Sequence, residues 1–170
     1  MEGKKRINNL IDTAERKRKS KDHGSGITKE FLIVSLGDTL LGVHIEYLRE
    51  VFDLPDRNDI IPLPFVPEYI YGVINVRGDI VPVLDLAVIL GTGKTGEDSL
   101  KIVIIEGSFK VAFPVLEIVD MKTIDVKDLR TVKETKRKGD EQFITQEFTA
   151  DGRTVSVVDI LKLFGSQQLS

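Results

Sequence analysis

The stretch GVINVRGDIVPVLDL, residues 72–86, joins two short runs rich in valine and isoleucine through the tripeptide Arg77-Gly78-Asp79. Short β-branched runs separated by turn residues are typical of strands, and a glycine between them supplies the positive φ that a tight hairpin needs. The stretch therefore predicts a β-hairpin that turns at Gly78. Two interpretations of Arg77 remain: a solvated side chain beside a turn, or a rigidly presented guanidinium that grips carboxylates or carbonyl groups of a partner.

The same pattern of short apolar runs and turns recurs along the chain. The predicted strands lie in residues 31–36, 40–45, 73–76, 80–86, 101–106, 110–115 and 154–161. Evenly spaced short strands with glycine-containing turns favour a β sandwich or barrel. Residues 45–54 and the segment VDILKLF near the end are typical of short helices. The predicted class is mainly β, with short helical pieces.

An internal repeat organises these strands. Residues 78–91, shifted by 74 positions, fall on residues 152–165 with matching glycine, valine and aspartate positions, and residues 34–43, shifted by 70, fall on residues 104–113. Each half has only about 60 residues and would be marginal alone. The repeat predicts two small β barrels that share a core. The changeover between its halves lies near residues 87–100.

Charge is distributed unevenly along the chain. Residues 1–22 carry a net charge of +4 and the remainder −7. Residues 1–26 end in a polar, glycine- and serine-containing run and predict a basic, flexible N-terminal arm, with a short amphipathic helix that docks on a membrane or partner as the alternative. Residues 166–170 are expected to be a C-terminal tail. An acidic body repels phosphate backbones, so we expect no nucleic-acid partner.

Other bulk properties bear on location. The chain has no cysteine, and none of its apolar runs approaches the roughly 18 to 20 residues that a membrane helix needs. We expect a cytoplasmic protein with no direct insertion into a membrane. A cytoplasmic location also disfavours an extracellular adhesion role for the Arg-Gly-Asp tripeptide.

Candidate catalytic and cofactor motifs are incomplete. The sequence GTGKTG at residues 91–96 lacks the earlier glycine of a phosphate-binding loop, since position 88 is valine, and a strand follows it instead of a helix. His23 and His44 have no neighbours that suggest a metal site. We therefore predict no catalytic residue, no metal and no cofactor.

Two aspartates occupy equivalent places in the two halves. Asp85 and Asp159 each follow a predicted strand and precede a predicted short helix. They could be paired carboxylates for acid–base chemistry. Separate but equivalent positions favour a structural role instead, in which each aspartate caps the helix after its strand.

Taken whole, IIPLPFVPEYIYGVINVRGDIVPVLDL, residues 61–86, resembles the signature of the CheW family, the scaffold proteins of bacterial chemosensory arrays. The matching residues are Ile61, Pro62, Pro64, Ile70, Gly72, Val73, Ile74, Asn75, Arg77, Gly78, Pro82, Asp85 and Leu86. The similarity extends over residues 27–165. It implies two SH3-like, five-stranded β barrels packed around a shared hydrophobic core.

The resemblance also implies a function. Proteins of this family are non-catalytic chemotaxis adaptors that couple the cytoplasmic tips of methyl-accepting chemoreceptors to the regulatory domain of the histidine kinase CheA, in receptor arrays at the membrane. The family's receptor-contact turn matches Asn75, Arg77 and Gly78 here. We expect these three to bind a partner. Gly72, Pro82, Asp85 and Asp159 are expected to form structural turns or caps.

The sequence departs from the family pattern in its second half. Ala112 stands where a glycine is usual, Leu116 replaces an aspartate, and Gln146 replaces a glycine before the last hairpin. Two alternatives therefore stay open. The chain could be a divergent CheW-like paralogue that serves another chemosensory-type pathway, or a ligand-binding sensor on the same fold with its site between the barrels.

Overall fold

The computed structural model describes residues 26–96, 101–132 and 143–167. Of the expected arm, residues 1–25 lie outside this description. Of the expected tail, residues 168–170 lie outside it, whereas residues 166 and 167 belong to the last helix. The strands are β1 Thr28–Ser35, β2 Leu40–His44, β3 Leu48–Asp53, β4 Ile70–Val76, β5 Asp79–Leu84, β6 Lys101–Glu106, β7 Lys110–Val115, β8 Glu117–Asp125, β9 Arg130–Thr131, β10 Ile144–Ala150 and β11 Arg153–Val158. The helical segments are η1 Ile45–Tyr47, η2 Arg57–Asp59, α2 Leu86–Ile89, η3 Val126–Asp128 and α3 Ile160–Gln167.

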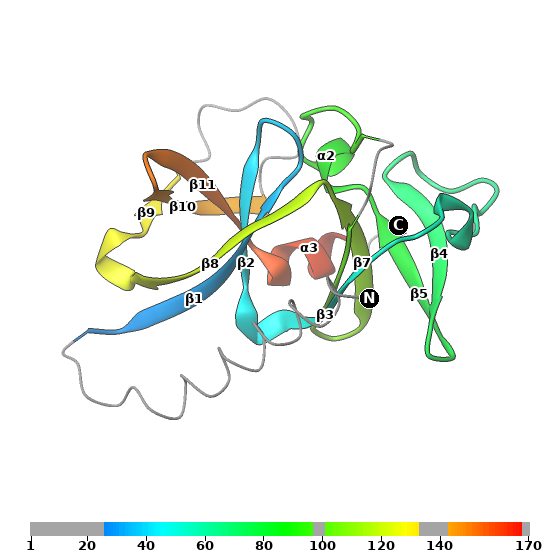
Figure 1. The fold of residues 1–170 in the computed structure, drawn as a ribbon, viewed down its shortest axis with the longest axis horizontal. Helices are drawn as coiled ribbons and strands as arrows, with labels where there is room; N and C mark the ends of the chain where they lie inside the picture. The colour runs from blue at the N-terminus through cyan, green and yellow to red at the C-terminus, as the bar shows by residue number, and fades with distance from the viewer. Residues whose placement is uncertain (1–25, 97–100, 133–142, 168–170) are drawn as a thin grey trace.

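Two sheets form the body of the molecule, side by side (Figure 1). Sheet A has six strands in the order β8-β1-β2-β11-β10-β9, and sheet B has five in the order β3-β6-β7-β5-β4. We call the sheets with their enclosed side chains lobe A and lobe B. The mainly β class with two barrel-like lobes is confirmed, and the short strand β9 is an addition to the five strands expected of lobe A.

The two sheets interleave the two halves of the repeat. In sheet A, β2 from the first half runs parallel to β11 from the second, with Gly42 opposite Val157. In sheet B, β7 from the second half runs parallel to β5 from the first, with Ala112 opposite Val83. The repeat relates these two pairs, because β2 shifted by 70 positions falls on β7 and β5 shifted by 74 positions falls on β11. Each lobe therefore draws strands from both sides of residues 87–100.

Buried side chains form three clusters, of which the largest is shared. Within lobe A, Phe31 and Phe148 pack on the valines of β11, and within lobe B, Ile74 and Ile104 pack on those of β5. The shared cluster joins both sheets with α2 and α3. It includes Leu41, Val43, Val51, Leu86, Val103, Phe113, Ile160 and Leu163, each 7% exposed or less. Burial of so many apolar side chains in one seam explains how two marginal halves stabilise each other.

One element differs from its prediction. Residues 45–54 were expected to be helical, but only the single turn η1 precedes the strand β3. Leu48 and Val51 are both buried, and this spacing of three is typical of a helix. The cause is an irregularity in the pairing of β3 with β6 between Leu48 and Glu50, which shifts the side-chain alternation by one residue.

Candidate partner-binding site

The turn between β4 and β5 has two consecutive residues with positive φ. Val76 lies opposite Asp79, and the residues between them have φ of 53° at Arg77 and 93° at Gly78. Two positive φ values identify the type I′ hairpin turn. A Cβ at Gly78 would meet no atom within 4 Å, so glycine is favoured there by backbone conformation and not by lack of space.

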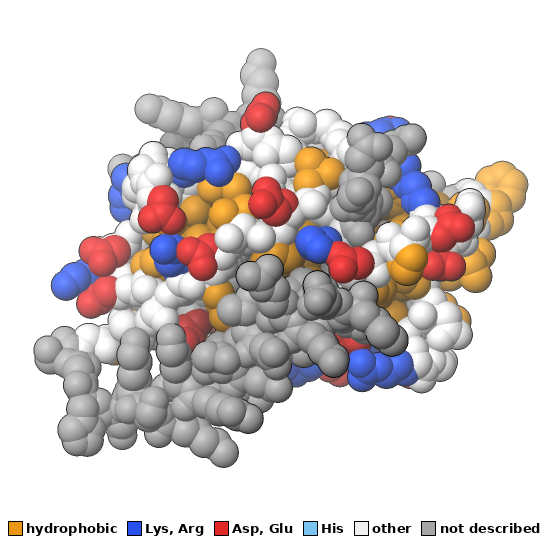
Figure 2. All heavy atoms as spheres, viewed as in Figure 1, with side chains coloured by type: hydrophobic (Ala, Val, Ile, Leu, Met, Phe, Trp, Pro, Cys, Tyr) orange, Lys and Arg blue, Asp and Glu red, His pale blue; other side chains and the backbone are white. Residues whose placement is uncertain are grey.

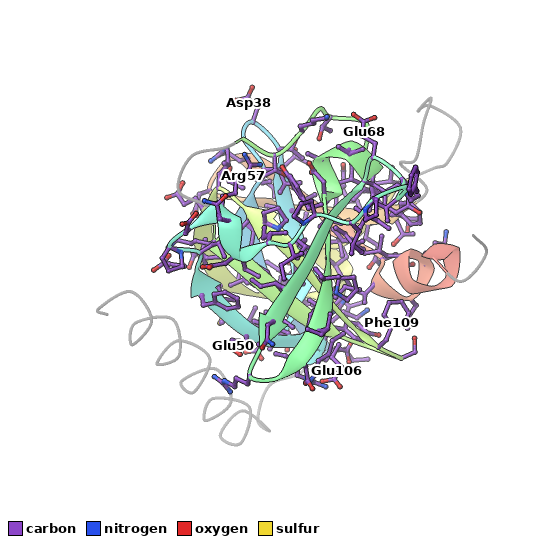
Figure 3. All side chains as sticks on the ribbon, turned by 90° about the vertical axis from the view of Figure 1, so that its right-hand side faces the viewer. Asp38, Glu50, Arg57, Glu68, Glu106 and Phe109 are labelled. Atoms are coloured by element: carbon purple, nitrogen blue, oxygen red, sulfur yellow. The ribbon has the colours of Figure 1, made fainter. Side chains whose placement is uncertain are left out.

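Side chains hold this turn from both sides. The Asn75 Oδ1 accepts a hydrogen bond from Gly78 N at 2.9 Å, which fixes the turn internally. The Arg77 Nη2 donates to Glu50 Oε1 of β3 at 2.9 Å, and Figure 3 shows Glu50 beside the end of this hairpin. The Arg77 side chain nevertheless stays 78% exposed. The guanidinium is therefore oriented by one contact while most of its five donors face outward.

The two residues that follow Gly78 differ: the charge of Asp79 is paired, and the apolar side chain of Ile80 is exposed. Lys110 Nζ lies 2.6 Å from Asp79 Oδ2, and this hydrogen bond lowers the pKa of the Asp79 carboxyl and raises the pKa of Lys110. Ile80, opposite Asn75, is 62% exposed. We call Asn75, Arg77, Gly78 and Ile80 the tip surface. It combines a presented cation with an exposed apolar side chain.

Residue 72 is a glycine for a different reason from Gly78, namely a close backbone contact. Its φ is 147°, and a Cβ there would lie 2.1 Å from the carbonyl oxygen of Ile61. Ile61 and Val73 exchange two backbone hydrogen bonds of 2.8 and 2.9 Å beside this contact. Only glycine allows the backbone at Ile61 to approach β4 so closely. Gly72 therefore seats the segment of residues 61–65 against the open edge of sheet B.

The segment seated by Gly72 exposes large apolar side chains. Phe65 has its ring fully in solvent and a φ of 59°, which is uncommon for a bulky residue, and Ile61 and Leu63 are 55% and 41% exposed. We call Ile61, Leu63 and Phe65 the edge surface. Figure 2 shows hydrophobic side chains gathered at the right-hand end of the molecule, where the β4 edge lies. The sequence prediction did not include this surface, although the alternation of prolines with apolar residues in residues 61–65 was a visible signal.

The two equivalent aspartates each begin a helix. Asp85 is the N-cap of α2, and its carboxylate accepts hydrogen bonds from Ala87 N and Val88 N. Asp159 Oδ1 accepts one from Lys162 N in α3. The backbone matches too, because Asp85 N donates to Tyr69 O and Asp159 N to Phe143 O, both at 2.7 Å. Pro82 lies within β5, half-buried and opposite Val73. The carboxylates of the two halves thus occupy separate, equivalent helix starts.

The glycine-rich residues 91–96 cover Asp85, and we call them the covering loop. Thr95 is buried, and its backbone N and Oγ1 donate to the Asp85 carboxylate at 3.2 and 2.9 Å. The Tyr71 hydroxyl donates to Thr95 O, and Arg57 donates to the same hydroxyl and lies over the Tyr71 ring (Figure 3 labels Arg57). These contacts hold the loop against Asp85 and Tyr71 and use both donors of Thr95.

The histidine of the described chain lies in a cleft of lobe A. His44 packs between Phe31 and Tyr47, with ring centroids 4.5 and 6.3 Å away. Burial, followed by the positive charge of Lys29, lowers the pKa of His44. Among the described residues no group of three or more potential His, Cys, Asp or Glu ligands gathers to hold a metal. In the same residues no helix has the length and apolar character needed to cross a membrane.

The three departures from the family pattern have clear places in the fold. Ala112 is fully buried opposite Val83. Leu116 donates its backbone N to Ser35 O, and Gln146 lies opposite Thr131 of β9. Position 146 needs no glycine because a regular strand, and not a closely crossing backbone, lies beside it.

The fold and the tip surface together define a two-lobed β scaffold without an assembled metal or phosphate site among the described residues. A model of the CheW-like domain family matches residues 30–168, and the chain therefore belongs to the CheW family of chemotaxis scaffold proteins.

Individual relatives agree with this assignment. The chain is 27% identical over 143 residues to the chemotaxis protein CheW of Rhizobium meliloti, covering 82% of this chain and 90% of that protein. It is 32% identical over 103 residues to the protein FrzA of Myxococcus xanthus, covering 59% and 62%. The crystal structure of the scaffolding protein TtCheW from Thermoanaerobacter tengcongensis matches with a TM-score of 0.71 and 27% identity, over 82% of this chain and 88% of that one.

Proposed function

We propose that this protein is a non-catalytic cytoplasmic adaptor that couples the cytoplasmic tips of chemoreceptors to the regulatory domain of the histidine kinase CheA. Membership of the CheW family supports the scaffold role. The observation that carries the proposal is the tip surface, where Arg77 is held by Glu50 and is still 78% exposed. An arginine presented in this way is suited to a reversible contact with carboxylates or carbonyl groups.

An adaptor needs two surfaces that can be occupied at once, and lobe B offers two. The tip surface lies at the turn of the β4–β5 hairpin, whereas the edge surface is seated by Gly72 nearer the other end of β4. We assign receptor binding to Asn75, Arg77 and Gly78. We assign kinase binding to the edge surface, because an exposed aromatic at a strand edge is a common anchor of protein interfaces.

The chain offers a matched pair of variants to test this assignment. Both Arg77 and Phe65 have positive φ, and asparagine tolerates that conformation better than other non-glycine residues. Arg77→Asn and Phe65→Asn therefore remove one partner contact each without new backbone strain. Binding is measured by calorimetric titration with an isolated CheA regulatory domain, and by co-sedimentation with membranes that contain a chemoreceptor.

We expect Phe65→Asn to weaken the kinase complex at least about tenfold and to leave receptor binding within a factor of about two. Arg77→Asn should weaken receptor binding at least about tenfold and leave kinase binding within a factor of about two. If either variant weakens both complexes equally, the two-surface assignment is wrong. If the unsubstituted protein binds neither partner, the coupling function itself is wrong.

The domain boundaries are part of the same proposal. We infer that residues 27–165 suffice for both partners and that the basic arm is dispensable. Deletion of residues 1–22 should therefore leave both dissociation constants unchanged. Loss of receptor binding at membranes, with kinase binding retained, would instead give the arm a direct role in recruitment.

A further inference from the structure

The covering loop rests on three residues of lobe B. Its Thr95 binds the Asp85 carboxylate through both the backbone N–H and the hydroxyl. The Tyr71 hydroxyl donates to the loop's backbone at 3.0 Å. Leu116 Cδ2 lies 3.5 Å from the position of a Cβ on the last residue of the loop. Asp85, Tyr71 and Leu116 therefore form the seat for a short extended segment.

The repeat places three counterparts of this seat in lobe A. The offset of 74 relates Asp85 to Asp159 and Tyr71 to Thr145, and the offset of 70 relates Leu116 to Glu46. All three counterparts line a single open cleft with a volume of about 200 Å³. Lys29, His44, Tyr47 and Gln146 complete its polar lining. The same backbone framework thus carries a covered seat in lobe B and, among the described residues, an open one in lobe A.

The two equivalent aspartates differ in how many hydrogen bonds their carboxylates accept. Asp85 accepts hydrogen bonds from its own helix and from the covering loop, whereas in the described part of the chain the Asp159 carboxylate accepts only from Lys162 N, at Oδ1. Asp159 Oδ2 therefore remains available as an acceptor. The charged side chains of the lining are Lys29, Glu46 and Asp159, and burial lowers the pKa of His44, which favours its neutral form. The cleft carries a net negative charge.

We propose that this cleft is a further partner site, which binds an extended peptide segment of another protein through a serine or threonine. The hydroxyl and the backbone N–H of that residue donate to Asp159, as those of Thr95 do to Asp85. Small residues on either side allow the segment to lie against Glu46 and Thr145. A phosphorylated side chain is rejected, because two carboxylates line the cleft. The site lies in lobe A, and it does not depend on the receptor and kinase assignments in lobe B.

The covering loop itself supplies the probe. An acetylated and amidated hexapeptide, Gly-Thr-Gly-Lys-Thr-Gly, is titrated into the full-length ¹⁵N-labelled protein, and the amide signals are followed by NMR. We expect saturable shifts at Thr145, Gln146 and Asp159. Valine in place of the second threonine of the peptide should weaken binding at least about tenfold, because the half-buried Asp159 carboxylate loses a hydrogen bond. A phosphate on that threonine should abolish saturation.

Two protein variants separate the site from general effects. Asp159→Asn keeps an oxygen for Lys162 N and a good helix cap, but it replaces the second acceptor with a donor, so peptide binding should weaken at least about tenfold. Asp151→Asn, in the same lobe but at the exposed β10–β11 turn, should leave it unchanged. The proposal is overturned if the peptide causes no saturable shift, if its shifts map to lobe B, or if the valine and threonine peptides bind equally.

Discussion

The turns of the two equivalent hairpins share a backbone conformation and place opposite charges at their first residue. The first turn reads Arg77-Gly78-Asp79, and the second reads Asp151-Gly152-Arg153. The φ values are 53° and 93° in the first turn, and 50° and 75° in the second. Arg77 pairs with Glu50, whereas Asp151 lies 3.4 Å from Lys122 of β8. The hairpin dictates the conformation and the glycine, while the sign of the exposed charge is free to vary and can serve partner choice.

The strands beneath these turns differ in what covers their outer edge. Both β4 and β10 have an irregular register at the same place, between Ile70 and Gly72 and between Ile144 and Gln146. Beside Gln146 lies the short strand β9. Beside Gly72 lies the closely approaching backbone that carries the edge surface. The same framework therefore leaves a protected edge in lobe A and an apolar docking edge in lobe B.

Gly72→Ala should give the largest effect of a single substitution. The new Cβ would meet the Ile61 carbonyl, so the segment at the β4 edge must detach or β4 must distort. We expect a loss of at least about 3 kcal/mol in the free energy of unfolding, measured by urea denaturation. The equivalent change Gln146→Ala should cost less than about 1 kcal/mol. Equal losses at the two positions would contradict the close-approach explanation.

The capping aspartates should show an intermediate difference. Asp85→Ala leaves the buried donors of Thr95 without an acceptor in addition to uncapping α2, and it should cost about 3 kcal/mol. Asp159→Ala removes one exposed cap and should cost about 1 kcal/mol. Urea unfolding of both variants under one set of conditions tests the difference. A smaller loss at Asp85 would mean that the covering loop does not rest on its carboxylate.

Protonation of His44 should make the folding stability depend on pH. Burial and the charge of Lys29 lower the pKa of His44 below the ordinary histidine value of 6.5, against the opposing charges of Glu46 and Asp159. The unfolded state therefore binds the proton more tightly, and the stability that neutral His44 allows is present above pH 6.5 and is lost as the pH falls below it. His44→Gln should flatten the decline in urea midpoint between pH 7.5 and 5. If the urea midpoint of the variant falls as steeply as that of the unsubstituted protein, carboxylates and not His44 cause the pH dependence.

The turn charges should have the smallest effect on stability. Both ion pairs are exposed, and such pairs contribute little. Arg77→Asn and Asp151→Asn should each change the free energy of unfolding by less than about 0.5 kcal/mol, as measured by thermal and urea unfolding. A loss above about 1.5 kcal/mol in Arg77→Asn would show that the arginine is a structural residue of the hairpin.

The sequence predicts the regular parts of the fold better than its edges. The repeat and the glycine turns locate the hairpins of both halves, although β10, which has few buried side chains, was not among the predicted strands. Residues 48–53 were misinterpreted because the register shift in β3 imitates helical spacing. The strand β8 has no apolar run, since it is an edge strand with mostly exposed or half-buried side chains. Phe65 was not predicted because its exposure and positive φ are set by the fold, and the alternation of prolines with apolar residues marks only the segment around it.

The interleaving of the halves has a consequence for synthesis on the ribosome. Lobe B cannot close until β7 is available to pair with β5, and lobe A keeps β1 and β2 without their parallel neighbour until β11 has been made. Pairing between such distant segments is slow, with folding times of roughly milliseconds to seconds. The hairpins β1–β2 and β4–β5 can pair within the first half, but they lack their parallel neighbours until the second half has been made. Their open apolar edges favour aggregation in that interval.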